Sequence, residues 1–158
     1  MKIIYLIFIL TFFIGCNDKT RNFEGIGQIK LGSNFDSLPS SKLFKNHSGN
    51  EYTIDSFKLS NEIGFVKNLN IKTDNGIIYD VSFNNSETTN ISAIDSLMKN
   101  FHKFNLINIA ENKSSPIQIF EETDGVVDFS KIVTKNNSQP IDYRYFDIKK
   151  VVNKADEN

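Results

Sequence analysis

The side chains that most often carry chemistry are scarce in this chain of 158 residues, which has one cysteine and two histidines. His47 and His102 are far apart in the sequence, and neither has a second histidine at the short spacing of a zinc motif. We therefore expect no metal site at either residue. His47 is predicted to lie in a loop, and His102 on the exposed or half-buried flank of a helix.

Four acidic residues gather around a glycine turn late in the chain, where carboxylates could bind calcium. They are Glu121, Glu122, Asp124 and Asp128. Their spacing lacks the alternating ligands and the closing glutamate of an EF-hand loop. The pattern favours a solvated hairpin tip over a calcium site.

Motifs for nucleophilic catalysis and phosphate binding are also missing from the sequence. No serine lies in the Gly-x-Ser-x-Gly pattern that strains a nucleophile into reactivity. The segment Gly25–Ile29 has two glycines of a phosphate loop, but it precedes a predicted strand and lacks the loop's lysine. We interpret it as a flexible lead-in to the first strand. We therefore expect a protein that is not an enzyme and has no cofactor. A hydrolase whose site is assembled from distant residues is kept as the least favoured of three function hypotheses.

The first fifteen residues have the layout of a signal peptide. Lys2 precedes an uncharged run from Ile3 to Gly15 that consists mostly of Ile, Leu and Phe. As a helix this run would be about 20 Å long, whereas the hydrocarbon core of a bilayer is about 30 Å thick. The run is therefore too short to span a membrane comfortably. Its positive start and the small residue at its exit are typical of a secretory signal peptide.

The residues Phe13-Ile14-Gly15-Cys16 resemble the lipobox of bacterial lipoproteins, in which leucine is commoner at the position of Phe13. The resemblance implies that the peptide is cut between Gly15 and Cys16, that diacylglycerol is joined to the thiol, and that the new amino terminus is acylated. A small residue before the cut gives a peptidase access, and a thiolate is the nucleophile that accepts the lipid. An uncleaved signal anchor and an ordinary signal peptide with an incidental cysteine are the alternatives.

These expectations divide the chain into a signal peptide (1–15), a lipidated cysteine with a short tether (16–22), a single domain (23–150) and a polar C-terminal tail (151–158). The lipoprotein resemblance also implies residence in the bacterial cell envelope. In that family's sorting rule, Asn17 in place of aspartate favours the outer over the inner membrane. The tether from 17 to 22 is about 20 Å long when fully extended, so the domain would stay close to the membrane.

The overall composition excludes several classes of protein. With 18 basic against 19 acidic side chains, the chain lacks the basic surplus of a dedicated nucleic-acid binder. An apolar content of 39% and an aromatic content of 12% argue against wholesale disorder. A single cysteine cannot form a disulfide within one chain.

The clearest strand signal is the segment 65–83, where apolar and polar residues alternate in two runs around Asp74-Asn75-Gly76. The expected apolar faces consist of Phe65, Leu69 and Ile71 in the first run and of Ile77, Tyr79, Val81 and Phe83 in the second. A three-residue turn that pairs Thr73 with Ile77 places these residues on one face of the sheet. It predicts a type I turn with a G1 bulge, in which Gly76 is left-handed.

Apolar residues then recur at spacings of three and four over residues 91–104, which predicts the main amphipathic helix. Asn90 or Ser92 would cap its start, and Ser92 with Asp95 resembles a capping box. A short helix is expected near 33–38, where Pro39 limits its length. Further strands are predicted over residues 51–59, 106–110, 116–122, 126–134 and 141–148.

Without repeated strand-helix-strand units, the pattern predicts the α+β class, with an antiparallel sheet of about five to seven strands packed on the 91–104 helix. The segment Ile29–Leu38 also resembles the opening strand, Leu-Gly turn and helix of small envelope domains such as the BamE-like and β-lactamase-inhibitor-like folds. Those families bind other proteins or support assembly. The resemblance therefore implies a contact surface and no catalytic residues.

The stretch Tyr143-Arg144-Tyr145-Phe146 is the best candidate for partner contact. Tyrosine and arginine are enriched at interface hot spots, and a late edge strand could dock a partner. The alternative is that Tyr143 and Tyr145 face the core with Ile141, while Arg144 pairs with a neighbour.

Two function hypotheses stand beside the hydrolase. The leading one is a lipid-anchored envelope protein that is not an enzyme and that binds another protein or contributes to envelope structure. The alternative is an inhibitor or immunity-type protein that neutralises an envelope-acting toxin or hydrolase. The expected partners are the membrane, through Cys16, and a second envelope protein, with no nucleic acid and no metal.

Overall fold

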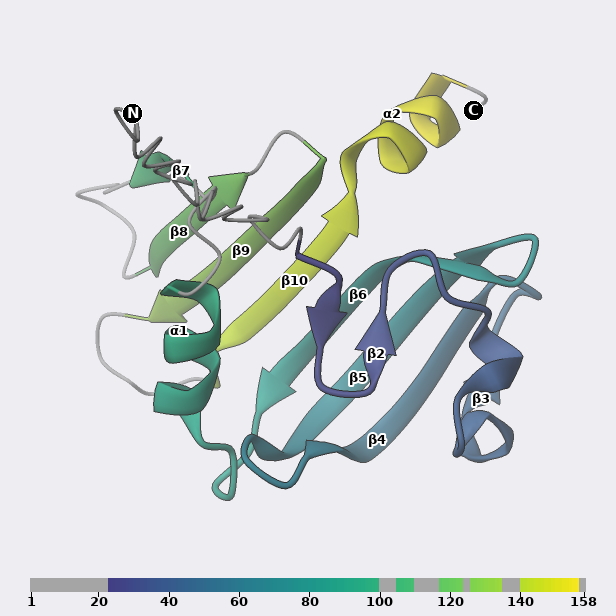
Figure 1. Cartoon of the computed structure of the whole chain (residues 1–158), viewed down its shortest axis with the longest axis horizontal. Coiled ribbons are helices and arrows are strands. Elements are labelled where there is room, and N and C mark those ends of the chain that lie inside the picture. Colours follow the sequence, from purple (N-terminus) through teal and green to yellow (C-terminus); the bar gives the residue numbers. More distant parts are fainter. Residues whose placement is uncertain (1–22, 100–104, 110–116, 124–125, 135–139, 157–158) are drawn as a thin grey trace, which may run out of the picture.

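The computed structural model describes residues 23–99, 105–109, 117–123, 126–134 and 140–156 of the chain (Figure 1). The expected signal peptide 1–15, the lipidation site Cys16 and the tether up to residue 22 lie outside the described residues. The same holds for His102 and Asp124, and for the C-terminal end of the expected 91–104 helix.

Eight strands form one antiparallel sheet in the order β3-β4-β5-β6-β10-β9-β8-β7. Their bounds are β3 Lys45–Asn46, β4 Glu51–Ser60, β5 Gly64–Asp74, β6 Ile77–Asn85, β7 Asn105–Ile109, β8 Ile117–Thr123, β9 Val127–Thr134 and β10 Asp142–Asp147. The strand β10 is central, because it pairs with β6 on one side and with β9 on the other. The predicted α+β class with an antiparallel sheet is confirmed, and the two-residue edge strand β3 adds one strand to the expected five to seven.

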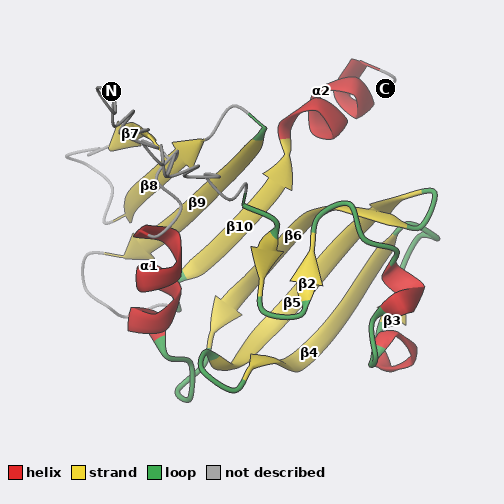
Figure 2. Ribbon diagram, in the orientation of Figure 1, coloured by secondary structure: helices red, strands yellow, loops and turns green. Residues whose placement is uncertain are grey.

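One face of this sheet, which we call the covered face, lies under helix α1 (Ile91–Lys99) and under a hairpin of β1 (Gly25–Ile26) and β2 (Ile29–Lys30) (Figures 1 and 2). A single hydrophobic core fills the space between these layers. Its fully buried apolar side chains include Ile26, Ile29, Leu59, Val66, Leu69, Ile71, Ile78, Val81, Ile94 and Tyr145.

The β1–β2 hairpin corrects the interpretation of Gly25–Ile29 as a flexible lead-in. Ile26 and Ile29 are both fully buried. The Tyr145 hydroxyl accepts a hydrogen bond from Ile26 N at 3.4 Å and donates one to Ile29 O at 2.9 Å. Burial of this hydroxyl raises the Tyr145 pKa. The hairpin is thus fixed to the central strand β10 through a residue far along the chain.

Helix α1 begins where the sequence predicts it. Asn90 is the cap, since its Oδ1 accepts a hydrogen bond from Ala93 N at 3.1 Å. The apolar stripe faces the sheet, with Ile94 fully buried and Met98 nearly so. The shorter expected helix is a single 3-10 turn, Phe35–Ser37, in which Asn34 Oδ1 accepts from Asp36 N at 2.8 Å.

The β5–β6 hairpin differs in register from the prediction of a three-residue turn. The turn has two residues, Asn75 and Gly76, both left-handed, and Asp74 pairs with Ile77. A bulge at Tyr79 then adds one residue to β6, so that Ile71 lies opposite Val81. The apolar residues beyond the bulge therefore still share a face. The bulge places them there, and not a three-residue turn.

This register also changes which hydrophobic side chains are buried. Ile78 is buried while Ile77 is 37% exposed, and Val66 is buried while Phe65 is 45% exposed. Val66 is buried in place of Phe65 because Asn68 has a left-handed backbone, with φ of 50°, where the β5 register shifts. The bulge at Tyr79 and the left-handed backbone of Asn68 thus reverse the expected alternation of buried and exposed residues at both ends of the hairpin.

The predicted polar tail over 151–158 is also corrected. Residues Ile148–Asp156 form a second helix, α2, which continues directly from β10 (Figure 1). Asp147 Oδ1 accepts a hydrogen bond from Lys150 N at 3.1 Å and so caps the start of the helix. The expected strand over 141–148 is correspondingly shorter.

Candidate functional site

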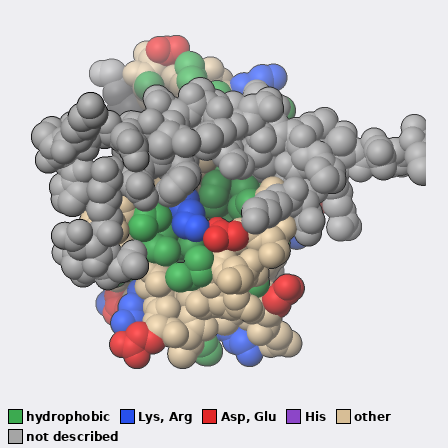
Figure 3. All heavy atoms as spheres, turned by 90° about the vertical axis from the view of Figure 1, so that its left-hand side faces the viewer, with side chains coloured by type: hydrophobic (Ala, Val, Ile, Leu, Met, Phe, Trp, Pro, Cys, Tyr) green, Lys and Arg blue, Asp and Glu red, His purple; other side chains and the backbone are tan. Residues whose placement is uncertain are grey.

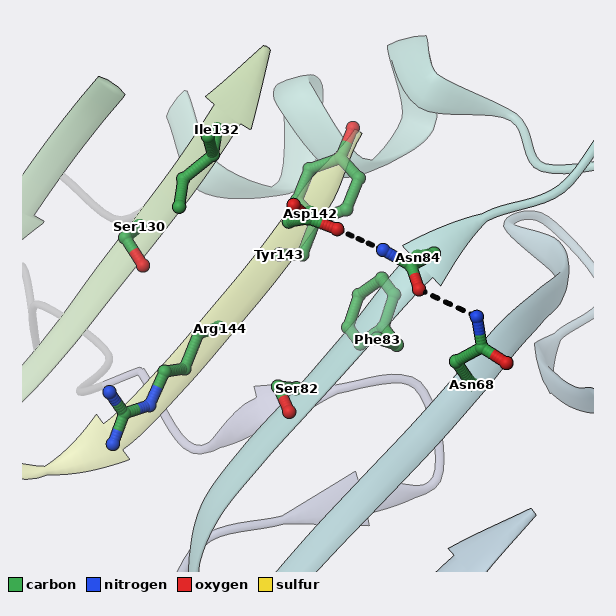
Figure 4. Close-up of a pocket in the computed structure, with 9 residues that line it drawn as sticks. All are labelled: Asn68, Ser82, Phe83, Asn84, Ser130, Ile132, Asp142, Tyr143 and Arg144. Atoms are coloured by element: carbon green, nitrogen blue, oxygen red, sulfur yellow. Dashed lines mark hydrogen bonds between the residues drawn. The ribbon is translucent and has the colours of Figure 1, made fainter. Parts of the chain in front are cut away.

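The face of the sheet opposite to α1 is polar along its central strands. Asn70 on β5, Ser82 on β6, Arg144 on β10 and Ser130 on β9 are direct neighbours across the strands and form one row. Figure 4 shows the last three on the same side of the sheet. We call this surface the open face. Its central row carries amide, hydroxyl and guanidinium groups and no apolar side chain.

A second row of the open face is tied together by hydrogen bonds (Figure 4). Asn68 Nδ2 donates to Asn84 Oδ1 at 2.9 Å, and Asn84 Nδ2 donates to Asp142 Oδ1. Three strands are thereby linked by side chains as well as by their backbones. Because each of these groups is held by its neighbour, their orientation is set in advance of any contact.

Arg144 is the charged centre of the open face. Its Nε and Nη2 donate to the two carboxylate oxygens of Asp80 at 2.9 and 2.7 Å. The Asp80 side chain is only 6% exposed, whereas that of Arg144 is 44% exposed. The guanidinium also lies over the Phe146 ring, 4.6 Å from its centroid. The hydrogen bond with Asp80 raises the Arg144 pKa further, with a smaller contribution from the charge of Asp128.

Between these rows the open face is hollowed into a shallow pocket of about 340 Å³. Its lining consists of Asn68, Ser82, Phe83, Asn84, Ser130, Ile132, Asp142, Tyr143 and Arg144. The lining offers hydrogen-bond donors and acceptors but no histidine or cysteine. Such a surface can bind a polar group through hydrogen bonds.

The structure decides between the two interpretations of the Tyr143–Phe146 stretch. Tyr143 is 1% exposed and Tyr145 is fully buried, and both face the core. The proposal that Tyr143, Arg144 and Tyr145 together contact a partner is therefore corrected for the two tyrosines. Strand β10 is central rather than an edge, and its alternate residues point to opposite faces, so of these three residues Arg144 alone lies on the open face.

An ion pair that no sequence pattern indicated holds α1 against the sheet. Lys131 Nζ on β9 donates to both oxygens of Asp95 at 2.8 and 3.1 Å, and lies 5.9 Å from the Tyr143 ring centroid. The Tyr143 hydroxyl is buried without a hydrogen-bond partner among the described residues, and this burial raises its pKa. Figure 3 views this side of the molecule, where hydrophobic side chains surround a basic and an acidic one.

The other residues that the sequence singles out do not form a reactive site in the described part of the chain. His47 Nε2 lies 2.7 Å from Thr53 Oγ1 on the exposed β3–β4 edge. Glu121 and Glu122 lie within β8 and pair with β9. Among the described residues, no three His, Cys, Asp or Glu side chains are grouped closely enough to hold a metal ion.

A further charged cluster joins α2 to the β5–β6 turn. Lys150 Nζ lies 2.8 Å from Asp74 Oδ2, and Lys154 Nζ lies 3.1 Å from Asp74 Oδ1. Lys154 also lies 5.9 Å from the Tyr79 ring centroid. The hydrogen bond from Lys150, followed by that from Lys154, lowers the Asp74 pKa.

We expect Asp74→Asn to loosen α2 while leaving the sheet intact. At neutral pH, amide hydrogen exchange of residues 148–156 should become several-fold faster, because both lysines lose their carboxylate. The same contact should fade in the unchanged protein as the pH falls below about 4, since a lowered carboxylate pKa stabilises the fold only while the group is ionised. Asp55→Asn is the control, because Asp55 pairs with Lys45 at an exposed site away from α2. Unchanged exchange in both variants would refute this role of Asp74.

Comparison with known proteins adds no relative to this picture. No protein-family model, curated protein or solved structure matches the chain.

Proposed function

We propose that this chain is a lipid-anchored protein of the bacterial cell envelope that is not an enzyme, and that its open face binds another envelope protein. The attachment is proposed at Cys16 and follows from the lipobox-like Phe13–Cys16. Binding is proposed for the rows that run through Ser82 and Arg144.

The position of Phe23 supports this arrangement. Phe23 is the first described residue after the tether, and its ring packs edge-to-face on Tyr145 with centroids 5.4 Å apart. Tyr145 faces the core, so the described part of the chain begins on the covered face. A tether of about 20 Å keeps that face near the bilayer. The open face, on the other side of the sheet, would then be directed away from the lipid.

The observation that carries the binding proposal is the fixed, half-exposed Arg144. Arginine is enriched among the residues that dominate interface energies, partly because its planar group stacks and forms several hydrogen bonds. Asp80 and Phe146 hold this guanidinium in place but leave Nη1 outside the paired hydrogen bonds. A partner's carbonyl or carboxylate can therefore be bound with little ordering of the side chain.

A photo-crosslinking residue placed at Ser82 in the full-length, membrane-bound chain tests this proposal. We expect one discrete crosslinked protein. We expect Asp80→Leu combined with Arg144→Met, which removes the guanidinium without leaving a buried carboxylate unpaired, to reduce its yield at least about tenfold, as for an interface hot spot. The control position is Asn61, which is exposed in the β4–β5 turn. Equal crosslinking from Ser82 and Asn61, or a yield that the double variant leaves unchanged, would contradict binding at the open face. A hydrolase or toxin as the crosslinked protein would favour the inhibitor hypothesis over a structural role.

The anchor has a separate test. We expect Cys16→Ser to leave the signal peptide uncleaved or to release the chain from membranes, because serine supplies no thiolate for the lipid. Membrane fractionation and immunoblotting measure both results. A Cys16→Ser chain that is processed and partitions like the unchanged protein would refute lipidation.

A further inference from the structure

The pocket of the open face contains one carboxylate that forms no ion pair within the described part of the chain. Asp142 lines this pocket and is exposed. Its Oδ1 accepts a hydrogen bond from Asn84 Nδ2, and none of the ion pairs between described residues includes it. The second carboxylate oxygen, Oδ2, can therefore accept a hydrogen bond from a group that enters the pocket.

The charges around Asp142 leave the centre of the open face acidic. On β6, β10 and β9 this face carries three carboxylates, those of Asp80, Asp128 and Asp142, and one cation, Arg144. The Arg144 guanidinium donates to both oxygens of Asp80 and lies over the Phe146 ring. Figure 4 shows it directed away from Asp142. A cationic group of a partner is therefore the electrostatic complement of this surface.

Two lysines of β5 share the open face but are separated from Asp142 by β6. Lys67 lies opposite Asn84 in the strand register, and Lys72 lies opposite Asp80. Neighbouring strands are about 4.8 Å apart, so the β5 backbone is about 10 Å from that of β10. This distance is close to the Debye length at about 0.1 M salt. The two lysines therefore neutralise Asp142 only weakly.

An apolar side chain lies next to the Asp142 carboxylate. Ile132 on β9 is directly opposite Asp142 and is half-buried at the edge of the pocket. Long basic side chains pack their methylene groups on apolar surface while the charged end reaches a polar partner. Ile132 and Asp142 together offer both kinds of contact.

The acceptors of the pocket favour lysine over arginine. A guanidinium typically binds a carboxylate through two parallel hydrogen bonds, one to each oxygen. Asn84 already donates to Asp142 Oδ1, which leaves Oδ2 as the oxygen without a donor among the described residues. An ammonium is a compact group with three donors and can bind Oδ2 alone.

We propose that the protein bound at the open face places a lysine side chain in this pocket, with its methylene groups on Ile132 and its ammonium on Asp142 Oδ2. This inference rests on the proposed binding at the open face and adds the chemical group that is recognised. The Asn68–Asn84–Asp142 hydrogen bonds hold the carboxylate in place, so little side-chain ordering accompanies the contact.

The crosslink from Ser82 measures the contribution of the carboxylate. The assay keeps the full-length, membrane-bound chain, since none of the helices in its described part is long and apolar enough to cross a membrane. Asp142→Asn removes the charge and keeps an oxygen that can accept from Asn84. We expect it to lower the crosslink yield about three- to fivefold, as for an ion pair that remains partly in water. High salt should lower the yield of the unchanged chain more than that of Asp142→Asn.

Glu62→Gln is the matched control, because Glu62 is exposed in the β4–β5 turn and the substitution removes the same charge. It should leave the crosslink yield unchanged. Both variants should unfold at the urea concentration of the unchanged chain, since neither loses a buried contact.

A zero-length crosslink identifies the partner's group. A water-soluble carbodiimide adds to a carboxylate, and an amine in contact with that carboxylate then displaces the carbodiimide as a urea and forms an amide. We expect such an amide between Asp142 and a lysine of the protein that Ser82 captures, detected by mass spectrometry as a branched peptide. The amide should be absent from Asp142→Asn and present in Glu62→Gln.

Three results would overturn the inference in distinguishable ways. One discrete protein captured from Ser82 with equal yield in Asp142→Asn and Glu62→Gln would refute the lysine contact while leaving binding at the open face in place. A yield that depends on Asp142 without an amide to lysine would point to another cation. Equal capture from Ser82 and Asn61 would refute the binding proposal and this inference together. If Asp142→Asn unfolds at lower urea, the carbodiimide product alone decides.

Discussion

Gly27→Ala is expected to destabilise the fold by at least about 3 kcal/mol. Gly27 has φ of +60°, and a Cβ there would lie 2.2 Å from the Leu59 carbonyl oxygen. The same carbonyl accepts the hydrogen bond from Gln28 N at 3.1 Å. The β1–β2 hairpin would have to move off β4, which would expose Ile26 and Ile29, and each of these side chains is worth about 1.5–3 kcal/mol when fully buried.

Gly32→Ala separates steric overlap from backbone strain. Gly32 has a similar φ of +77°, but no atom lies within 4 Å of the position that a Cβ would take. Only the cost of the left-handed backbone applies there, about 1–2 kcal/mol. Urea unfolding of the two variants measures the difference. Equal destabilisation by both substitutions would contradict the explanation that a side chain at position 27 overlaps β4.

The second large effect is expected at the centre of the open face. Arg144→Met should cost about 2–3 kcal/mol, because Asp80 would remain in place with no partner for a carboxylate that is only 6% exposed. The half-exposure of Arg144 keeps this below the cost of breaking a fully buried pair. Chemical denaturation at neutral pH measures the loss.

A double variant shows whether the loss comes from the unpaired carboxylate. We expect Asp80→Leu combined with Arg144→Met to regain most of the stability, since apolar replacements remove the buried charge. Lys45→Met is the comparison at an exposed pair, where Lys45 Nζ lies 3.6 Å from Asp55, and it should change stability by less than about 1 kcal/mol. A double variant no more stable than Arg144→Met would contradict this explanation.

Local patterns predicted most of the elements because their determinants are local. The alternation of apolar residues along β5 and β6 and the Asn90 cap of α1 are properties of short segments. The β5–β6 register was missed for the opposite reason. The extra residue at Tyr79 is visible only when both strands are paired, and it permits the two-residue turn that the alternation argued against.

The site depended on contacts between distant residues, which alternation along one strand cannot reveal. Arg144 and Asp80 are 64 positions apart, and Lys131 and Asp95 are 36 apart. Tyr143 and Tyr145 are core residues because they point to the covered face of the central strand β10, where they are buried. The sequence of β10 alone leaves open which of its two faces is covered. Helix α2 was missed because its lysines and asparagine hide a four-residue apolar arc in a polar composition.

The proposed orientation of the covered and open faces relative to the membrane depends on the lipid anchor at Cys16. Intact-mass spectrometry of the chain extracted from bacterial membranes tests it most directly. We expect a mature protein that begins at Cys16 and carries the added mass of a diacylglycerol thioether, with a further acyl group on its amino terminus. A chain that still begins at Met1, or one whose Cys16 is unmodified, would contradict it.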